Sequence, residues 1–391
     1  MHQGAAGLRY PAAYAGTSIP CFAFHPPLYP NSRVPKFHWD TRCVRGIAPA
    51  LGLSGWAVCA IKRGMNALAT YIHNLDPVIL DIPGTPLALR WYGLAYVAGF
   101  ILGYMVLLAL SKRRLYVVEP GKLGDFITSV CIFGVLLGGR LGEFFFYWLP
   151  ENGLSGFLDD PLWVVRVWEG GMASHGGILG VLTVACLYAY RNKLSALAVC
   201  DGLAIVAPIG LFFGRVANFI NGELYGRITD SALGVKFPQE LFELPAAERV
   251  AALAQVEQAA GASLAQLAHE NEGSFDTLLR LCRENSAVQD ALAPYLHGRY
   301  PSQLFEAVGE GLLIFAVLIT LRLTLKNARA GLFSGVFCLL YAAARITCEC
   351  FKQPDAAVWN GITEGQLLSL IVVAMGVFFL CGAARSKRVE A

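Results

Sequence analysis

Charged residues are scarce in this chain. Only 15% of its 391 residues are Asp, Glu, Lys or Arg, whereas soluble domains carry about 25%. The formal net charge of +3 argues against a nucleic-acid-binding protein, because such proteins concentrate positive charge. Hydrophobic residues make up 55% of the sequence and the mean hydropathy is +0.51. This composition predicts an integral membrane protein.

The sequence also lacks the residue patterns of common metal and nucleotide sites. Its eleven cysteines include no CxxC pair, and Cys348 and Cys350 would face different directions on a helix. The ionisable residues lack the spacing of a metal site, and no phosphate-binding glycine loop occurs. We therefore expect no metal, no cofactor and no disulfide framework.

Long apolar runs predict the architecture. A membrane-spanning helix needs about 20 mostly apolar residues. Seven runs near that length occur, at about 91–111, 125–149, 174–190, 196–215, 303–322, 331–351 and 364–383. The expected fold is an all-α integral membrane protein, a bundle of about seven transmembrane helices. Gly134, Gly138 and Gly142 form a ridge of small residues in the second run, which predicts a close contact with another helix.

Positive charge between the runs predicts their orientation. Lys and Arg concentrate in the first, third and fifth loops and in the C-terminal tail, whereas the second and sixth loops offer only Arg166 and Lys352. Cytoplasmic loops carry the excess of Lys and Arg. The C-terminus is therefore predicted to be cytoplasmic, and the second, fourth and sixth loops are predicted to face the opposite side.

Two segments depart from the pattern of spans. In the fourth loop, about 216–302, apolar residues recur three and four apart in a stretch rich in Ala, Leu, Glu and Gln. This is typical of amphipathic helices, so residues 227–300 are predicted to form a small periplasmic helical head domain within the seven-span unit 65–391. Residues 1–64 are Pro-rich and have no helical period. They are either a real N-terminal extension or the product of a start assigned too far upstream of Met65.

Several charged residues lie inside the predicted spans, where a charge costs about 2.5 to 3.5 kcal/mol on insertion scales. They are Arg90, Arg140, Glu143, Asp201, Arg215, Glu306, Glu310, Arg345 and Glu349. Arg140 and Glu143 are three residues apart, so this pair can neutralise itself on one helix face. The same holds for Arg345 and Glu349, which are four apart. A purely structural role is thus one explanation for each pair.

The arginines suggest a second explanation. Arg140, Arg215 and Arg345 come from three separate spans. A planar guanidinium binds two phosphate oxygens at once and stays protonated. A cluster of such groups in the outer half of a bundle is suited to the phosphate of a lipid head group.

A histidine lies at the entrance to the third span. In the motif WEGGMASHGGILG, glycines follow and precede His175 and leave its imidazole open to a ligand. An imidazole can accept a proton near neutral pH. The alternative is an interfacial histidine that only hydrogen-bonds a carbonyl.

Four stretches carry a resemblance to a known family. They are RWYGL (90–94), WEGGMASHGGILG (168–180), GRVANFINGELYGR (214–227), and the late pair RYPSQLFEA (299–307) with YAAARITCECFKQPD (341–355). In that order, the chain from about residue 76 to its end resembles the bacterial prolipoprotein diacylglyceryl transferases. The Asn-Gly-Glu motif is the most specific of these signals, whereas HGG alone is weak.

The resemblance implies a multi-pass enzyme of the bacterial inner membrane with its active site toward the periplasm. The reaction implied is transfer of the sn-1,2-diacylglyceryl group from phosphatidylglycerol to the lipobox cysteine thiol of a preprolipoprotein, with a thioether formed and glycerol phosphate released. Its partners would be phosphatidylglycerol, lipobox peptides and membrane lipids. The site residues implied by matching motifs are His175, Arg215, Asn218, Glu223, Gly226, Tyr341, Arg345 and Glu349, with Tyr92 and Arg140 as further matches.

The chemistry of the transfer suggests roles for these residues. Charge builds on the departing phosphate oxygen, and guanidinium donors stabilise it. We therefore assign Arg215 and Arg345 to the phosphate, with Arg140 in support. Asn218 and Glu223 are expected to hydrogen-bond the glycerol head group or to orient the arginines.

Two points stay open from sequence alone. His175 is the expected base for the thiol, but a field of arginines could favour the thiolate without it, which would leave His175 a positioning residue. An ion-coupled membrane transporter would also explain Asp201, Glu306 and Glu310 inside a bundle. A transporter predicts charges across the full membrane depth, whereas the motifs here gather toward the outer half.

Overall fold

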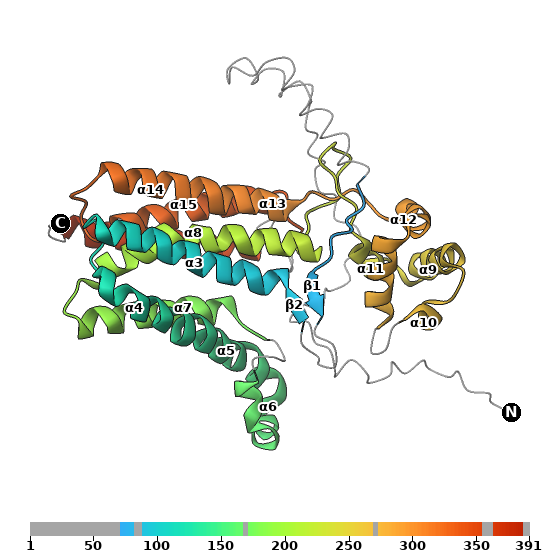
Figure 1. Ribbon diagram of the computed structural model, residues 1–391, viewed down its shortest axis with the longest axis horizontal. Helices are drawn as coiled ribbons and strands as arrows, with labels where there is room; N and C mark the ends of the chain where they lie inside the picture. The colour runs from blue at the N-terminus through green and yellow to red at the C-terminus, as the bar shows by residue number, and fades with distance from the viewer. Residues whose placement is uncertain (1–70, 82–87, 167–170, 269–272, 354–362, 386–391) are drawn as a thin grey trace, which may run out of the picture.

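The computed structural model describes residues 71–81, 88–166, 171–268, 273–353 and 363–385. The described chain is nearly all helical, apart from a small antiparallel sheet of β1 (Val78–Asp81) and β2 (Ala88–Arg90) (Figure 1). Six described helices are long and apolar enough to cross a membrane: Trp91–Lys112, Pro120–Ser155, Ala196–Asn221, Ser302–Thr324, Leu332–Glu349 and Gly365–Arg385. The predicted class, a helical integral membrane bundle, is confirmed.

The spans are built from the following elements. The first is α3 (Trp91–Lys112). The second combines α4 (Leu123–Ser129), η3 (Val130–Leu137), α5 (Gly138–Glu143), η4 (Phe144–Trp148) and the start of α6 (Leu149–Asp159). The fourth is α8 (Ala196–Asn221), and the fifth combines α13 (Ser302–Glu306), the π-helical segment η9 (Ala307–Leu313) and α14 (Ile314–Thr324). The last two are α15 (Leu332–Glu349) and α16 (Glu364–Arg385).

The third predicted span, 174–190, is present as α7 (Ser174–Arg191), but it is not among the six long apolar helices. Its 18 residues include His175, Arg191 and three glycines, which make it less apolar than the others. α7 packs along η3 and α5 of the second span. This seventh span, unlike the other six, therefore stays a prediction.

Glycines line the contact between α7 and the second span. A methyl group on Gly176 would lie 2.3 Å from the carbonyl oxygen of Gly138 and 2.5 Å from the Cα of Gly142. A methyl group on Gly180 would lie 2.3 Å from the carbonyl oxygen of Gly134. The two backbones therefore touch without side chains between them, and the close contact predicted from the glycine ridge is confirmed.

α8 extends beyond the predicted span 196–215, to Asn221. No glycine or proline interrupts residues 216–221, and the helix ends where Gly222 takes the left-handed conformation, with φ of 68°, that favours glycine at a C-cap. The first half of GRVANFINGELYGR is therefore helical. The fourth loop begins at Gly222 and not at about 216, as the sequence had suggested.

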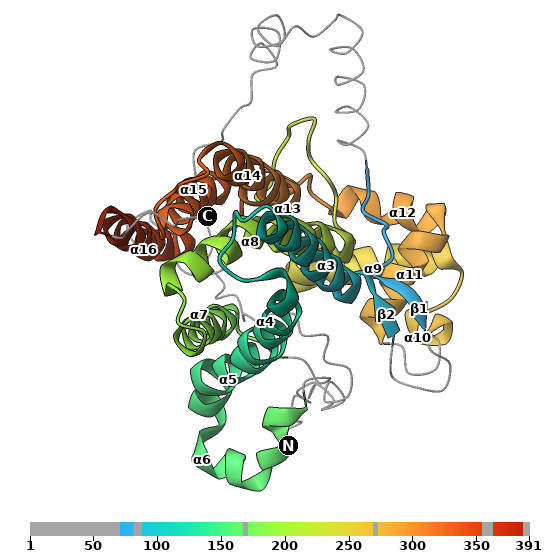
Figure 2. The ribbon, with the colours of Figure 1, turned by 60° about the vertical axis from the view of Figure 1, so that its left-hand side comes forward.

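One end of the bundle gathers the predicted site residues. Neighbouring spans run antiparallel. The starts of α3, α7 and α13 and the ends of α8 and α15 therefore lie at the end of the bundle nearer to β1, β2 and the head helices (Figure 1). Figure 2 shows α4, α5 and α7 as one group and α3, α8 and α13 to α16 as another, with α6 projecting away from both. The second loop, expected at 150–173, thus contains α6 and a 3-10 turn, η5 (Pro161–Val165).

Within the inserted segment 227–300, the described helices lie between Pro238 and Tyr295, whereas residues 227–237 and 296–300 are joined by isolated β-bridges such as Ile228 with Arg299. The segment contains the 3-10 turns η7 (Pro238–Glu243) and η8 (Ala293–Tyr295) and the helices α9 (Ala246–Ala260), α10 (Leu264–Leu267), α11 (Ser274–Glu284) and α12 (Ser286–Leu292). Leu241, Val256, Leu278 and Val288 are fully buried in a core of its own. The independent head domain and its periplasmic location stay predictions, as does the origin of residues 1–64, which lie outside the described residues.

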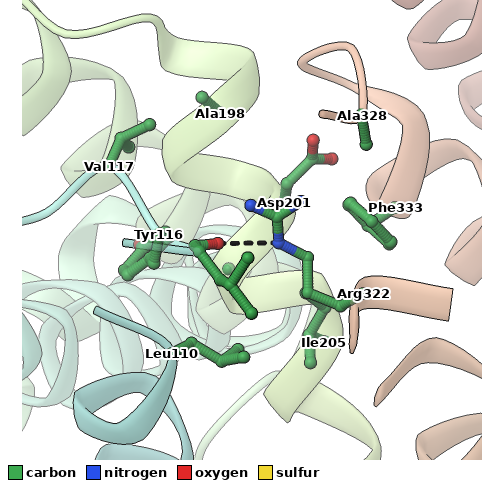
Figure 3. A pocket seen from close by; sticks show the side chains of 11 residues that line it. Leu110, Tyr116, Val117, Ala198, Asp201, Ile205, Arg322, Ala328 and Phe333 are labelled. Carbon is green, nitrogen blue, oxygen red and sulfur yellow. Dashed lines mark hydrogen bonds between the residues drawn. The ribbon is translucent and has the colours of Figure 1, made fainter. Parts of the chain in front are cut away.

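Charges at the opposite end of the bundle hold helix ends. Asp201 of α8 accepts hydrogen bonds from the backbone N–H groups of Gly331 (2.7 Å) and Ser334 (2.8 Å) at the start of α15, as a capping residue does. Arg322 donates from Nε to the carbonyl of Leu115 at 2.7 Å (Figure 3). The cavity that Asp201 and Arg322 line has a volume of about 20 Å³, room for a single water molecule. It lies roughly 20 Å from Arg215 along α8, so it is too small and too distant to be the lipid site.

Candidate functional site

Arg215 of α8 and Arg345 of α15 converge on two glutamates of the fifth span. Arg345 Nη1 lies 2.5 Å from Glu306 Oε1, and Arg215 Nε lies 3.2 Å from Glu306 Oε2. Each guanidinium also lies 3.5 Å from Glu310. Both glutamate side chains are fully buried, whereas 17% of Arg215 and 14% of Arg345 stay exposed. The two arginines predicted to meet are therefore brought together.

Glu306 and Glu310 are the residues that sequence reasoning missed. They were counted only as charges that a transporter could use, yet they fix the geometry of both arginines. A signal was available, because two acids four residues apart in an apolar span share one helix face. The predicted pair of Arg345 and Glu349 is also present, with 3.4 Å between Nη2 and Oε2.

The cluster holds no surplus of positive charge. Arg215 and Arg345 supply two positive charges, while the carboxylates of Glu306, Glu310 and Glu349 lie within 3.5 Å and supply three negative charges when ionised. The acids therefore orient the guanidinium donors instead of leaving a positive field. Among the described residues, no three His, Cys, Asp or Glu side chains are grouped as metal ligands.

Two predicted tyrosines border the cluster. Tyr341 lies one helical turn before Arg345 on α15, within electrostatic reach of both arginines, and stacks on Phe337 with 5.8 Å between ring centroids. Tyr92, at the start of α3, lies within electrostatic reach of Arg215 and Glu223. Both residues are thus brought to the site that the motifs predicted.

Asn218 and Glu223 are joined directly. Asn218 Nδ2 donates to Glu223 Oε1 at 2.7 Å, and Asn221 Nδ2 donates to the same oxygen at 3.3 Å. Asn218 is 7% exposed and lies less than one turn beyond Arg215 on α8. The end of α8 therefore presents a carboxylate held by two amides beside the arginine pair.

Gly226 lies where three backbone segments cross. Its N–H donates to the carbonyl of Tyr300 at 2.8 Å. A methyl group at Gly226 would lie 2.5 Å from the carbonyl oxygen of Phe351 and 2.7 Å from that of Tyr300. The structure accounts for this glycine by close approach of the backbones.

Arg140 lies in different surroundings from the other two arginines. Its guanidinium stacks on Trp163, with 3.8 Å from Cζ to the ring centroid, and donates to the carbonyls of Val164, Arg166 and Gly171 at 3.0 Å and to that of Trp163. α5, which carries Arg140, packs against α7. The expected convergence of three arginines is thus reduced to two, since Arg140 holds residues 163–166 and Gly171 against α5.

His175 is the second residue of α7 and its side chain is exposed. Within the described part of the chain, no hydrogen bond or ion pair engages its imidazole, whereas the alternative reading had it bound to a carbonyl. Gly176 next to it packs on Gly142, which fixes the helix that carries the histidine. Residues 167–170 of the same motif lie outside the described residues.

His73 is a further residue that sequence reasoning missed. Its ring is stacked on Phe237, with 5.2 Å between centroids, and lies edge-on to Phe219 at 5.4 Å. The residue is 3% exposed, and burial lowers the pKa of its imidazole from 6.5 to about 4. Phe219 follows Asn218 directly, so a neutral histidine supports the end of α8.

His73 should make folding sensitive to acid. Between pH 6.5 and about 4 the unfolded chain binds a proton at His73 that the folded protein does not bind. The free energy of unfolding is therefore highest above pH 6.5 and decreases as the pH falls. The loss approaches roughly 3 kcal/mol at pH 4. Thermal unfolding in detergent at pH 7.5 and pH 5 should show a larger drop for the natural protein than for His73→Phe. Equal drops would contradict this assignment.

Comparison with known proteins finds relatives over most of the chain. The family model described as prolipoprotein diacylglyceryl transferase matches residues 77–381. Three similar curated proteins bear the name phosphatidylglycerol–prolipoprotein diacylglyceryl transferase. That of Bdellovibrio bacteriovorus is 40% identical over 331 residues (79% of this chain, 93% of the relative), that of Azospirillum brasilense 36% over 323 (81% and 98%), and that of Rickettsia bellii 34% over 313 (78% and 95%).

Proposed function

The chain belongs to the prolipoprotein diacylglyceryl transferase family, and we propose that it transfers the sn-1,2-diacylglyceryl group of phosphatidylglycerol to the lipobox cysteine of preprolipoproteins. This is the first step of lipoprotein maturation. The enzyme is a multi-pass membrane protein, for which we propose the bacterial inner membrane with the site toward the periplasm. The transporter alternative is set aside, because the family accounts for the buried charges of the site.

The transfer exchanges one bond at a glycerol carbon. The cysteine sulfur attacks the carbon that bears the phosphate, a C–S bond forms, and the C–O bond to the phosphate breaks. Glycerol phosphate leaves with the bonding electron pair, and the thiol proton passes to a base. Donors directed at the departing phosphate oxygen therefore lower the barrier.

The observation that carries the proposal is the pair of partly exposed guanidinium groups fixed by one buried carboxylate, that of Glu306. Arg215 uses Nε and Nη2 for the glutamates, and its Nη1 has no ion-pair partner among the described residues. Preorganised donors of this kind bind a phosphate without reorganising during the reaction. Asn218 and Glu223 then lie next to the phosphate, suited to the hydroxyl groups of the glycerol head.

The charges around the two arginines determine whether the cysteine thiol needs a separate base. Three carboxylates surround the two arginines, so a positive field strong enough to favour the thiolate by itself is not available. A separate proton acceptor is needed. We propose His175, which is exposed and is the second residue of α7. The start of α7 lies at the same end of the bundle as the start of α3 and the end of α8 (Figure 1).

A lipidation assay tests the proposal. The purified enzyme, in vesicles of phosphatidylglycerol, should raise the mass of a lipobox peptide by one diacylglyceryl group and release glycerol phosphate, whereas vesicles of phosphatidylethanolamine alone should give neither product.

His175→Gln should lose more activity at pH 7 than at pH 9, because the thiol ionises unaided at the higher pH. Transfer without released glycerol phosphate would overturn the chemistry, and an equal loss at both pH values would overturn the role of His175.

A further inference from the structure

The turn that follows α8 has a strained backbone. Gly222 and Leu224 both have positive φ, 68° and 57°. Glycine accepts this conformation readily, but leucine does not, since its Cβ crowds the backbone. Glu223 lies between them. The amides of Asn218 and Asn221 hold its carboxylate, but the position of its backbone depends on whatever holds the turn in place.

Side chains from two other segments hold three carbonyls of this turn. Gln303 Nε2 donates to the carbonyl of Glu223 at 2.6 Å, and Ser302 Oγ donates to that of Leu224 at 3.1 Å. Gln239 Nε2 donates to the carbonyl of Asn221 at 3.0 Å. All three contacts are hydrogen bonds, and together the three residues clamp the strained turn.

Gln303 is the most deeply placed member of the clamp. Its side chain is fully buried at the start of α13, where an amide is costly unless it is hydrogen-bonded. Its Nε2 bonds Glu223, while Oε1 has no hydrogen-bond partner within the described residues. An apolar residue would fill the same volume without this cost, so the amide is accounted for by its bond to the turn.

We propose that Gln303 is a positioning residue of the transferase, which fixes the backbone at Glu223 and thereby aims the Glu223 carboxylate at the glycerol head of phosphatidylglycerol. The inference rests on the proposed function, because it takes Glu223 as a contact of the head group. Gln303 itself does not touch the lipid. Its effect should therefore appear in the use of phosphatidylglycerol and not in the use of the peptide.

Gln303→Met tests this, because methionine has nearly the same shape and lacks the amide. We expect the KM for phosphatidylglycerol to rise about tenfold, with the KM for the lipobox peptide unchanged. The matched control is Gln289→Met, which removes an amide bond to the carbonyl of Cys282 in the head helices and should leave both values unchanged. If Gln303→Met raised both KM values equally, or neither, the inference would be overturned.

A double-mutant cycle separates positioning from a general structural role. Leu224→Gly removes the strain that the clamp opposes, so Gln303→Met should cost less in that background than in the natural protein. Additive effects would contradict the proposal. Ser302→Ala, which removes a single hydroxyl from the clamp, provides the same comparison if Gln303→Met does not fold. If Glu223→Gln lost activity while Gln303→Met kept normal activity, only the inference about Gln303 would be overturned. If Glu223→Gln kept normal activity, the role proposed for Glu223 in the transferase would be overturned.

Discussion

Arg345→Lys is expected to lower kcat/KM for phosphatidylglycerol by at least about 100-fold, although the positive charge is kept. Arg345 uses Nη1 for Glu306 and Glu310 and Nη2 for Glu349. A single ammonium group cannot contact these acids and still direct a donor at a phosphate. The fork of the guanidinium, not its charge, is what the site requires.

Arg215→Lys should show a loss of similar size. Its Nε and Nη2 are held by Glu306 and Glu310, which leaves Nη1 for the lipid. The matched control is Arg191→Lys, because Arg191 is exposed in the last turn of α7, at the far end of the bundle. The kcat/KM of Arg345→Lys, Arg215→Lys and Arg191→Lys should be measured from turnover of a lipobox peptide with phosphatidylglycerol in vesicles. If either site variant kept more than about a tenth of the natural kcat/KM, charge would suffice and the role of the fork would be lost.

Glu306→Gln is expected to lower kcat/KM by about 100-fold and to lower the melting temperature, even though it makes the cluster less negative. Glu306 lies within 3.2 Å of both arginines and is fully buried. Loss of one partner of a buried ion pair costs about 3 to 5 kcal/mol. Without Glu306 the two guanidinium groups lose their closer shared partner and keep only the longer contacts with Glu310 and Glu349.

Glu310→Gln makes the same change in charge and serves as the comparison. Its contacts with the arginines are longer, 3.5 Å each, so a loss of only about tenfold is expected. Both variants should be measured in the lipidation assay and by thermal unfolding in detergent. Increased activity in Glu306→Gln would show that net charge governs phosphate binding, and equal losses in both variants would show that the shorter contacts have no special role.

The sequence was most informative where the physical signal is local. Apolar runs of helix-spanning length identified the spans, and charges inside them identified Arg215 and Arg345, because both signals depend only on neighbouring residues. The left-handed Gly222 that ends α8 shows the limit of this approach. The residues before it are compatible with either a helix or a loop, and only the structure reveals that Asn218 lies on the helix.

The remaining features depend on which helices are neighbours. Arg140 was grouped with the other arginines because spacing along the chain does not reveal that α5 packs on α7. Glu306 was not recognised as the shared partner for the same reason. Gln303 and His73 carry no charge signal at all, since a neutral buried side chain acquires its role only from tertiary contacts such as those with Glu223 and Phe237.

The contact of Gly176 with Gly142 limits how the membrane part of the enzyme can deform. With no side chains between α5 and α7 to change rotamer, the two helices can separate or slide only by breaking a backbone-to-backbone fit. The two helices should therefore move as one rigid unit, and His175 should move with them. A lipid that diffuses sideways from the bilayer would then have to enter between helices whose contact is made by flexible side chains. The interface of α5 and α7 with α3 and α8 is therefore the place to look for a lipid entrance.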